Sequence, residues 1–155
     1  MNRAPGKVGR VADDRVVVRG AGAGDRDEVW GLAREFATSF VPERSAFDES
    51  YARLLTAAHT LLLVAEVPGQ GVVGYLLANS HTTFLANGPV AWVEEVMVDE
   101  GVRRMGVGRR LMEHAEEWAQ SVGAAYLALA SRRAGDFYVA LGYEDSATFY
   151  KKTFS

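Results

Sequence analysis

Two adjacent carboxylates, Glu94 and Glu95, stand inside the apolar run from Ala91 to Val98. The apolar and β-branched residues around them predict a buried strand, where a charged group is costly unless it is paired. A carboxylate that is partly removed from water has a raised pKa, which suits general-base catalysis. Adjacent strand residues point to opposite faces, so at most one of the two should face a reaction centre unless a bulge intervenes.

A basic, glycine-containing loop follows this strand and leads into an apolar helix. It includes Arg103, Arg104, Gly106 and Gly108. A helix N-terminus carries unpaired N–H groups and about half a positive charge, and glycines let an anion approach the backbone. Arginines add donors that suit phosphate oxygens. The pattern predicts a site for a phosphorylated ligand, with a tight turn and solvated arginines as the alternative.

Two common phosphate-binding motifs do not fit this chain. The P-loop string G-x-x-x-x-G-K-[ST] does not occur in the sequence. The stretch GAGAGD supplies Gly20 and Gly22, but Asp25 stands where a dinucleotide fingerprint needs its third glycine. A nicotinamide-dependent enzyme is therefore disfavoured.

The hydrophobic pattern predicts the elements that position these residues. Asp25 is the expected N-cap of the first helix, with Glu28 completing a capping box. The order of elements favours one α/β (α+β) domain over residues 15–155, after a flexible leader at 1–14. The predicted elements are a strand at Arg15–Ala21, a helix after Asp25, a helix at Phe47–Ala58, strands at Thr60–Val67, from Val72 and at Ala91–Val98, a helix at Gly108–Val122, a strand at Ala124–Ala130, a helix at Gly135–Leu141 and a last strand at Thr148–Phe154.

Composition limits the function classes. The 155 residues are 48% apolar, enough for a core, and the net charge of −3 argues against a nucleic-acid or membrane-surface partner. The chain has no cysteine, which excludes disulfides, thiolate zinc sites and cysteine nucleophiles. No apolar run is long enough for a transmembrane helix. The N-terminal residues lack the apolar segment of a secretory signal, so we expect a cytoplasmic protein. His59, His81 and His114 lack metal-like spacing, so we expect no metal.

Three segments together resemble the GCN5-related N-acetyltransferase (GNAT) superfamily. The loop at 103–108 matches its R/Q-x-x-G-x-G/A pattern, and Val96–Asp99 is similar to the end of its fourth strand. The segment FYVALGYE, Phe137–Glu144, resembles its F-Y-x-x-L-G-F/Y-E segment. The element order from Arg15 to Phe154 also agrees. The resemblance implies a GNAT domain with a mixed, mostly antiparallel sheet flanked by helices, in which strands four and five splay apart.

The resemblance also implies acetyl-CoA as co-substrate. In this family the loop amides hold the pyrophosphate, and the pantetheine arm lies between strands four and five. Many members carry Asn after strand five, where this chain has Ser131, whose side chain has a shorter reach. The implied acetyl-CoA-binding residues are Val96, Met97, Val98, Arg103, Arg104, Met105, Gly106, Val107, Gly108, Arg109, Ser131 and Tyr138.

Catalytic roles follow from the same resemblance. Related polyamine and amino-sugar acetyltransferases carry an acidic pair at this place, which makes Glu94 the base, acting through water, and Glu95 the substrate anchor. The alternative is that one glutamate pairs with a loop arginine and the other faces solvent. Tyr138 stands where the family places a general acid for the departing sulfur. The absence of cysteine closes a ping-pong route through a thioester, which leaves direct attack in a ternary complex.

The sequence thus predicts an N-acetyltransferase that moves the acetyl group of acetyl-CoA to a primary amine of a small molecule. Acidic residues near a reaction centre attract ammonium groups, which supports an amine acceptor. Two alternatives stay open: acetylation of a protein N-terminus or lysine, and a non-catalytic acyl-CoA-binding module. The identity of the amine is not readable from the sequence, and a homodimer is compatible with it.

Overall fold

The computed structural model describes residues 13–36 and 40–154. The first twelve residues of the predicted leader lie outside this part. Within it, the strands form one sheet in the order β1-β2-β3-β4-β5. Neighbours from β1 to β4 are antiparallel, whereas β4 and β5 are parallel. The predicted mixed, mostly antiparallel sheet is therefore confirmed.

None of the helices in the described residues is long and apolar enough to cross a membrane.

The elements follow the predicted order along the chain. The strands are β1 (Val17–Gly20), β2 (Thr60–Val67), β3 (Gly71–Thr83), β4 (Gly88–Val98) and β5 (Leu127–Leu129). The α-helices are α1 (Arg26–Phe36), α2 (Arg44–Thr56), α3 (Val107–Ser121) and α4 (Gly135–Ala140), and the 3₁₀ helices are η1 (Ala23–Asp25) and η2 (Glu100–Met105).

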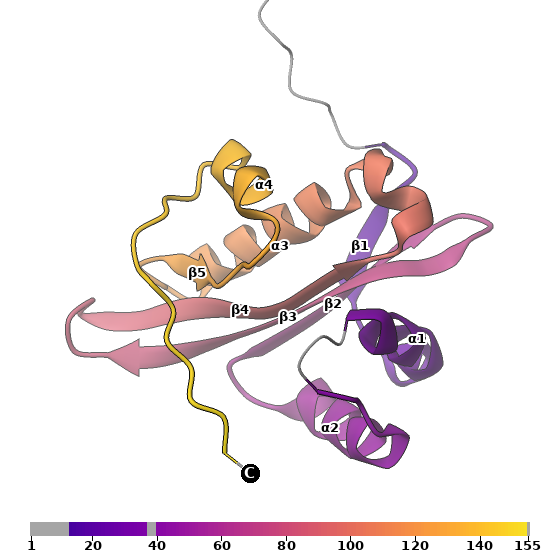
Figure 1. Ribbon diagram of the computed structural model, residues 1–155, viewed down its shortest axis with the longest axis horizontal. Coiled ribbons are helices and arrows are strands. Elements are labelled where there is room, and N and C mark those ends of the chain that lie inside the picture. Colours follow the sequence, from indigo (N-terminus) through magenta and orange to yellow (C-terminus); the bar gives the residue numbers. More distant parts are fainter. Residues whose placement is uncertain (1–12, 37–39, 155) are drawn as a thin grey trace, which may run out of the picture.

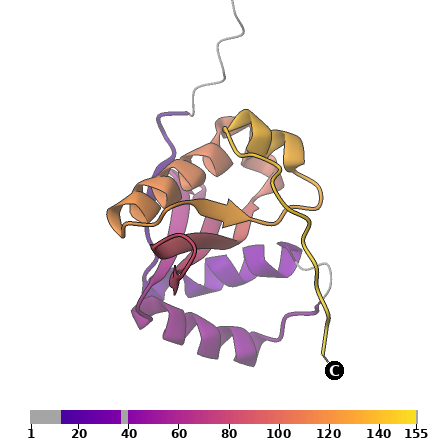
Figure 2. The same cartoon turned by 90° about the vertical axis from the view of Figure 1, so that its left-hand side faces the viewer.

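The sheet is the middle of three layers, with α1 and α2 on one face and α3 and α4 on the other (Figures 1 and 2). Alternate residues of the central strands therefore enter two different cores. On β2, Leu63 and Ala65 pack toward α3, whereas Val64 between them packs toward α1 and α2. Burial on both faces explains why this strand is an almost continuous apolar run in the sequence.

The start of α1 is held by contacts that differ from the predicted cap. Asp25 is not the N-cap, because its carboxylate accepts a hydrogen bond from the Gly22 N–H at 2.8 Å, at the start of η1. The guanidinium of Arg19 donates to the same carboxylate and lowers the pKa of Asp25. The predicted capping role of Glu28 is also wrong, because Glu28 Oε2 accepts from the Val72 N–H at 2.8 Å. These contacts tie α1 to β1 and β3.

The predicted last strand, Thr148–Phe154, is absent from the structure described here. This segment has no regular secondary structure and runs from the α4 side of the sheet to the side of α1 and α2 (Figures 1 and 2). Phe149 stacks on Trp92 of β4 with ring centroids 6.4 Å apart. The strand predicted at Ala124–Ala130 forms over only three residues, so it offers a short edge for any further strand to pair with.

Gly74 of β3 lies where the start of α3 packs tightly against the sheet. A Cβ at this position would lie 3.0 Å from the Met97 carbonyl oxygen and 3.1 Å from Val107 Cγ1. The first of these is backbone and the second belongs to a fully buried side chain, so neither moves easily. A side chain here would push the start of α3 away from β3 and β4.

We expect Gly74→Ala to lower the free energy of unfolding by about 1–3 kcal/mol, because it overpacks this contact. Urea denaturation followed by tryptophan fluorescence measures the change. Gly31→Ala is the matched control: a Cβ at Gly31 meets nothing within 4 Å, and alanine is the better helix former by up to about 1 kcal/mol. Equal effects of the two substitutions would contradict the packing described for Gly74.

Candidate active site

A β-bulge in β4 decides where the acidic pair points. In the β3–β4 register Leu77 lies opposite Glu95, and Ala78 lies opposite Val93, so Glu94 is one extra residue in β4. Val93 packs in the core beneath α3, whereas Glu95 faces α1 and α2. In a regular strand these two residues would share a face. The bulge therefore turns the Glu95 carboxylate out of the α3 core.

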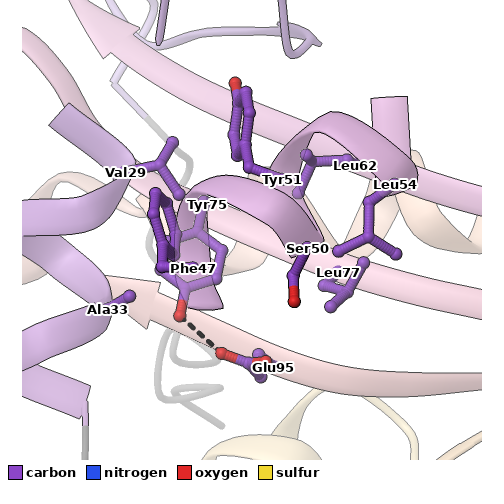
Figure 3. A pocket seen from close by; sticks show the side chains of 10 residues that line it. All are labelled: Val29, Ala33, Phe47, Ser50, Tyr51, Leu54, Leu62, Tyr75, Leu77 and Glu95. Carbon is purple, nitrogen blue, oxygen red and sulfur yellow. Dashed lines mark hydrogen bonds between the residues drawn. The ribbon is translucent and has the colours of Figure 1, made fainter. Parts of the chain in front are cut away.

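Glu95 is held by a buried tyrosine of the neighbouring strand. The Tyr75 hydroxyl donates to Glu95 Oε1 at 2.7 Å (Figure 3). Tyr75 is only 3% exposed, and burial together with the nearby Glu95 charge raises the pKa of its phenol well above the ordinary value. The phenol therefore stays protonated and remains a donor at neutral pH. The expected alternative, a loop arginine as the partner of this glutamate, is not what the structure has.

Glu95 lies at the side of a pocket between the sheet and helices α1 and α2 (Figure 3). The pocket has a volume of about 100 Å³ and is partly open to solvent. Glu94 is exposed and does not line it. The lining residues are Val29 and Ala33 of α1, Phe47, Ser50, Tyr51 and Leu54 of α2, Leu62 of β2, Tyr75 and Leu77 of β3, and Glu95 of β4.

β4 and β5 separate immediately before the acidic pair. Their parallel pairing covers Ala91 to Val93 on β4 and ends at the Val93–Leu129 pair. β4 continues to Val98, so its last five residues have no partner on the β5 side within the described residues. Backbone N–H and C=O groups at such an edge need another partner, which a bound ligand can supply.

The predicted loop after β4 is a 3₁₀ helix, η2, rather than an irregular turn. Its N-cap, Asp99, accepts a hydrogen bond from the Gly101 N–H at 2.8 Å. Gly106 then takes the left-handed conformation with φ of 76°, which favours glycine, and α3 begins. The first hydrogen bond of α3 joins the Arg110 N–H to the Gly106 carbonyl. The N–H groups of 107–109 precede it and point out of the helix start, where they suit an anion.

Arginines surround this helix start. Arg103 lies 3.8 Å from Glu100 and is exposed, as is Arg104. Arg109 and Arg110 are half-buried at the first turn of α3. Among the described residues, none of the last three arginines forms an ion pair with a carboxylate, so their charge adds to the helix dipole.

Tyr138 of α4 sits on the α3 side of the sheet. Its ring lies edge-on to those of Phe137, at 5.0 Å, and Tyr143, at 6.0 Å. Burial raises the pKa of Tyr138, so its phenol is protonated at neutral pH. The Tyr143 hydroxyl donates to Glu116, whereas that of Tyr138 has no hydrogen-bond partner in the described part of the chain. Tyr138 and Glu95 thus belong to opposite faces of the sheet and can meet only through the opening beside β4.

Phe137 and Ser131 help to position α4 against the start of α3. A Cβ at Gly108 would lie 3.2 Å from Phe137 Cζ, so the second glycine of the loop lets α4 lie against the start of α3. Ser131 Oγ accepts a hydrogen bond from the Ala134 N–H at 3.0 Å, in the turn that begins α4. Its hydroxyl proton remains available to a ligand. His114 Nδ1 is 2.9 Å from the Arg110 carbonyl, which gives this histidine a structural contact.

Sequence reasoning missed Tyr75 and the aromatic side chains of α2. Phe47 and Tyr51 recur at helical spacing, which indicates a core face as well as a pocket wall. Tyr75 stands in an apolar strand, and only the register of β3 on β4 brings its hydroxyl to Glu95. A phenol in a buried strand needs a polar partner. That requirement is the only feature of the sequence that could have pointed to a contact for Tyr75. In the described residues no cluster of three or more His, Asp or Glu side chains could hold a metal ion.

Residues 27–143 match the model of the acetyltransferase (GNAT) family. The chain belongs to this family of acetyltransferases, which use acetyl-CoA as co-substrate. The sequence matches no curated protein.

Solved structures support the same fold. Glucosamine-6-phosphate N-acetyltransferase from Arabidopsis thaliana superposes with a TM-score of 0.80 at 18% identity, over 90% of this chain and 99% of that one. A putative acetyltransferase from Agrobacterium tumefaciens has a TM-score of 0.79 at 24% identity, over 89% and 99%. AAC(6′)-Iy in complex with the bisubstrate analogue CoA-S-monomethyl-acetylneamine has a TM-score of 0.74 at 21% identity, over 90% and 99%.

We expect Tyr75→Phe to lower the free energy of unfolding at neutral pH by about 1–3 kcal/mol, because Glu95 loses a donor inside the fold. The raised pKa of Tyr75 adds a pH dependence. Above about pH 10 the unfolded chain releases this phenol proton before the folded chain does, so the stability that Tyr75 contributes below pH 10 is lost. The variant should therefore lose stability less steeply at alkaline pH.

Urea denaturation at pH 7 and across pH 9–11 measures both effects. Tyr150→Phe is the control, because Tyr150 is 87% exposed and the chemical change is the same. Identical behaviour of the two variants would show that the contact between Tyr75 and Glu95 does not stabilise the fold.

Proposed function

We propose that this protein transfers the acetyl group of acetyl-CoA to a primary amine of a small molecule, by direct attack in a ternary complex. The observation that carries the proposal is the end of the β4–β5 pairing at Val93 and Leu129. From that point the free edge of β4 runs past the acidic pair to η2 and the basic start of α3. One continuous stretch of chain thus offers a carboxylate pocket at one end and an anion site at the other.

The residues along this stretch fit acetyl-CoA, which supplies the acetyl group as a thioester. The N–H groups at the start of α3, with Arg103 and Arg104 beside them, suit a diphosphate. The unpaired backbone groups of 96–98 suit the amides of a pantetheine arm. Ser131 can donate its hydroxyl proton to the same ligand. The proposed set also includes Met105, Gly106, Val107, Gly108, Arg109 and Tyr138.

Each catalytic side chain has one task in the proposed reaction. Glu95 holds the incoming ammonium group, and Glu94, exposed at the bulge, takes one proton from it through water. The amine nitrogen then forms a bond to the thioester carbonyl carbon as the carbon–sulfur bond breaks. Tyr138 donates its phenol proton to the departing sulfur, and the protonated state that its burial favours suits this task. The new amide nitrogen releases its remaining excess proton to water, and the Tyr138 phenolate regains a proton from water.

A small acceptor is favoured over a protein chain by the position of the pocket. Helices α1 and α2 cover the face on which Glu95 opens, which leaves a confined space where a peptide acceptor would need an open groove. Two of the structurally similar proteins support the same choice. One is named for acetylating glucosamine 6-phosphate, and the other is bound to an analogue that joins CoA to acetylneamine.

We expect Tyr138→Phe and Glu94→Gln each to lower kcat by about a hundredfold, the usual contribution of a general acid or base. Acetyl-CoA affinity should stay nearly unchanged, because neither side chain is proposed to hold the diphosphate. Release of the CoA thiol reports turnover, and the absence of cysteine keeps that signal clean. Calorimetry with acetyl-CoA reports binding.

Tyr126→Phe is the matched control, since Tyr126 is 55% exposed and lies outside the site. If Tyr138→Phe and Glu94→Gln both turn over like the parent protein, the two catalytic roles are wrong. If the parent protein gives no saturable heat with acetyl-CoA, the proposed function itself is wrong.

A further inference from the structure

The pocket beside Glu95 is apolar to an extent that restricts the acceptor. Only four of its ten lining side chains carry a polar atom: Ser50, Tyr51, Tyr75 and Glu95. The other six are aliphatic or aromatic, and they come from both helices and from β2 and β3 (Figure 3). A ligand that fills this space therefore contacts carbon atoms over most of its surface.

Two of the four polar side chains already have their donors engaged. The Tyr51 hydroxyl donates to the Gly22 carbonyl at 2.6 Å, and the Tyr75 hydroxyl donates to Glu95 at 2.7 Å. What remains for a ligand is the Ser50 hydroxyl, the free acceptor positions of the Glu95 carboxylate and the acceptor lone pairs of the two phenol oxygens. The pocket can thus satisfy one charged donor and few other polar groups.

Among the residues that the structure describes, Glu95 is also the one charged side chain that lines the pocket. Both arginines of α2 pair with other carboxylates: Arg44 with Asp48 at 2.8 Å and with Asp27, and Arg53 with Glu49 at 2.7 Å. A cationic nitrogen in the pocket therefore meets a carboxylate, and none of the ten described lining residues carries a competing guanidinium. The charge favours an ammonium group at this one point only.

We propose that the acceptor is a primary amine whose nitrogen is joined by a short carbon chain to an aromatic ring or a branched alkyl group. This inference rests on the proposed function, and it names the class of acceptor. The ammonium group lies at Glu95, and the apolar group packs against Phe47, Leu54 and Leu77. Burial of that group is favourable, whereas the hydroxyls of an amino sugar would lose water without gaining partners.

Turnover of a panel of amines with acetyl-CoA tests the inference. The apolar probes are 2-phenylethylamine and 3-methylbutylamine, and the polar probes are glucosamine and 1,4-diaminobutane. We expect kcat/KM for at least one apolar probe to exceed that for both polar probes by about tenfold or more, the discrimination an apolar pocket provides.

Leu77→Asn locates the effect in the pocket, because Leu77 lies directly opposite Glu95 on β3. It should lower kcat/KM for the preferred apolar amine about tenfold, without weakening acetyl-CoA binding in calorimetry. Leu77→Met should retain activity, which separates polarity from a general packing defect. Leu85→Asn at the 99% exposed hairpin tip makes the same chemical change outside the pocket and should leave all rates unchanged.

The outcomes separate this inference from the proposed function. Faster turnover of glucosamine or 1,4-diaminobutane overturns the acceptor class but supports acetyl transfer. Acetyl-CoA binding without turnover of either apolar probe also overturns the acceptor class. Unchanged selectivity in Leu77→Asn would show that this pocket does not select the acceptor. Absence of acetyl-CoA binding overturns the proposed function instead.

Discussion

The single extra residue in β4 is the constraint on which the rest of the site depends. In the middle of β3 and β4 the two faces pack against different cores, so a side chain of β4 such as Val93 or Met97 enters one core or the other. A regular strand would place Glu95 on the same face as Val93, in the apolar core beneath α3. Leaving a carboxylate there without a partner would cost several kcal/mol of stability. The bulge at Glu94 moves Glu95 to the other face, where Tyr75 supplies a hydrogen bond.

The edge of β4 that faces β5 determines whether a ligand can reach the acidic pair. β5 pairs with β4 over only three residues, and its chain then turns away toward α4. A longer parallel pairing would consume the backbone groups of 94–98 and would close the opening beside the acidic pair. Two glycines shape the loop that follows β4. Gly106 takes the left-handed conformation before α3, and Gly108 leaves room for the Phe137 ring of α4. Backbone geometry, more than any one side chain, therefore creates the proposed donor site.

In the pocket beside Glu95, helices α1 and α2 supply much of the apolar lining, and strand β4 supplies the carboxylate. η1 and α1 are anchored by Asp25 and Glu28, whose carboxylates accept hydrogen bonds from backbone N–H groups outside the pocket. The aromatic and aliphatic residues of α1 and α2 are then free to form an apolar wall over Glu95. Because the two tyrosines of the pocket have their hydroxyls engaged, polarity is concentrated at one carboxylate. This arrangement distinguishes a site for one charged group from a site for a molecule with many hydroxyls.

The sequence by itself determined the order of elements, the loop at 103–108 and the family, because these depend on local periodicity and on short motifs. It did not determine that Glu28 binds β3 instead of capping α1, or that Tyr75 holds Glu95. Those contacts join residues 44 and 20 positions apart, and they depend on strand register and helix docking. The expected strand at 148–154 fails for the same reason, since a strand exists only where another strand offers an edge, and β5 offers three residues.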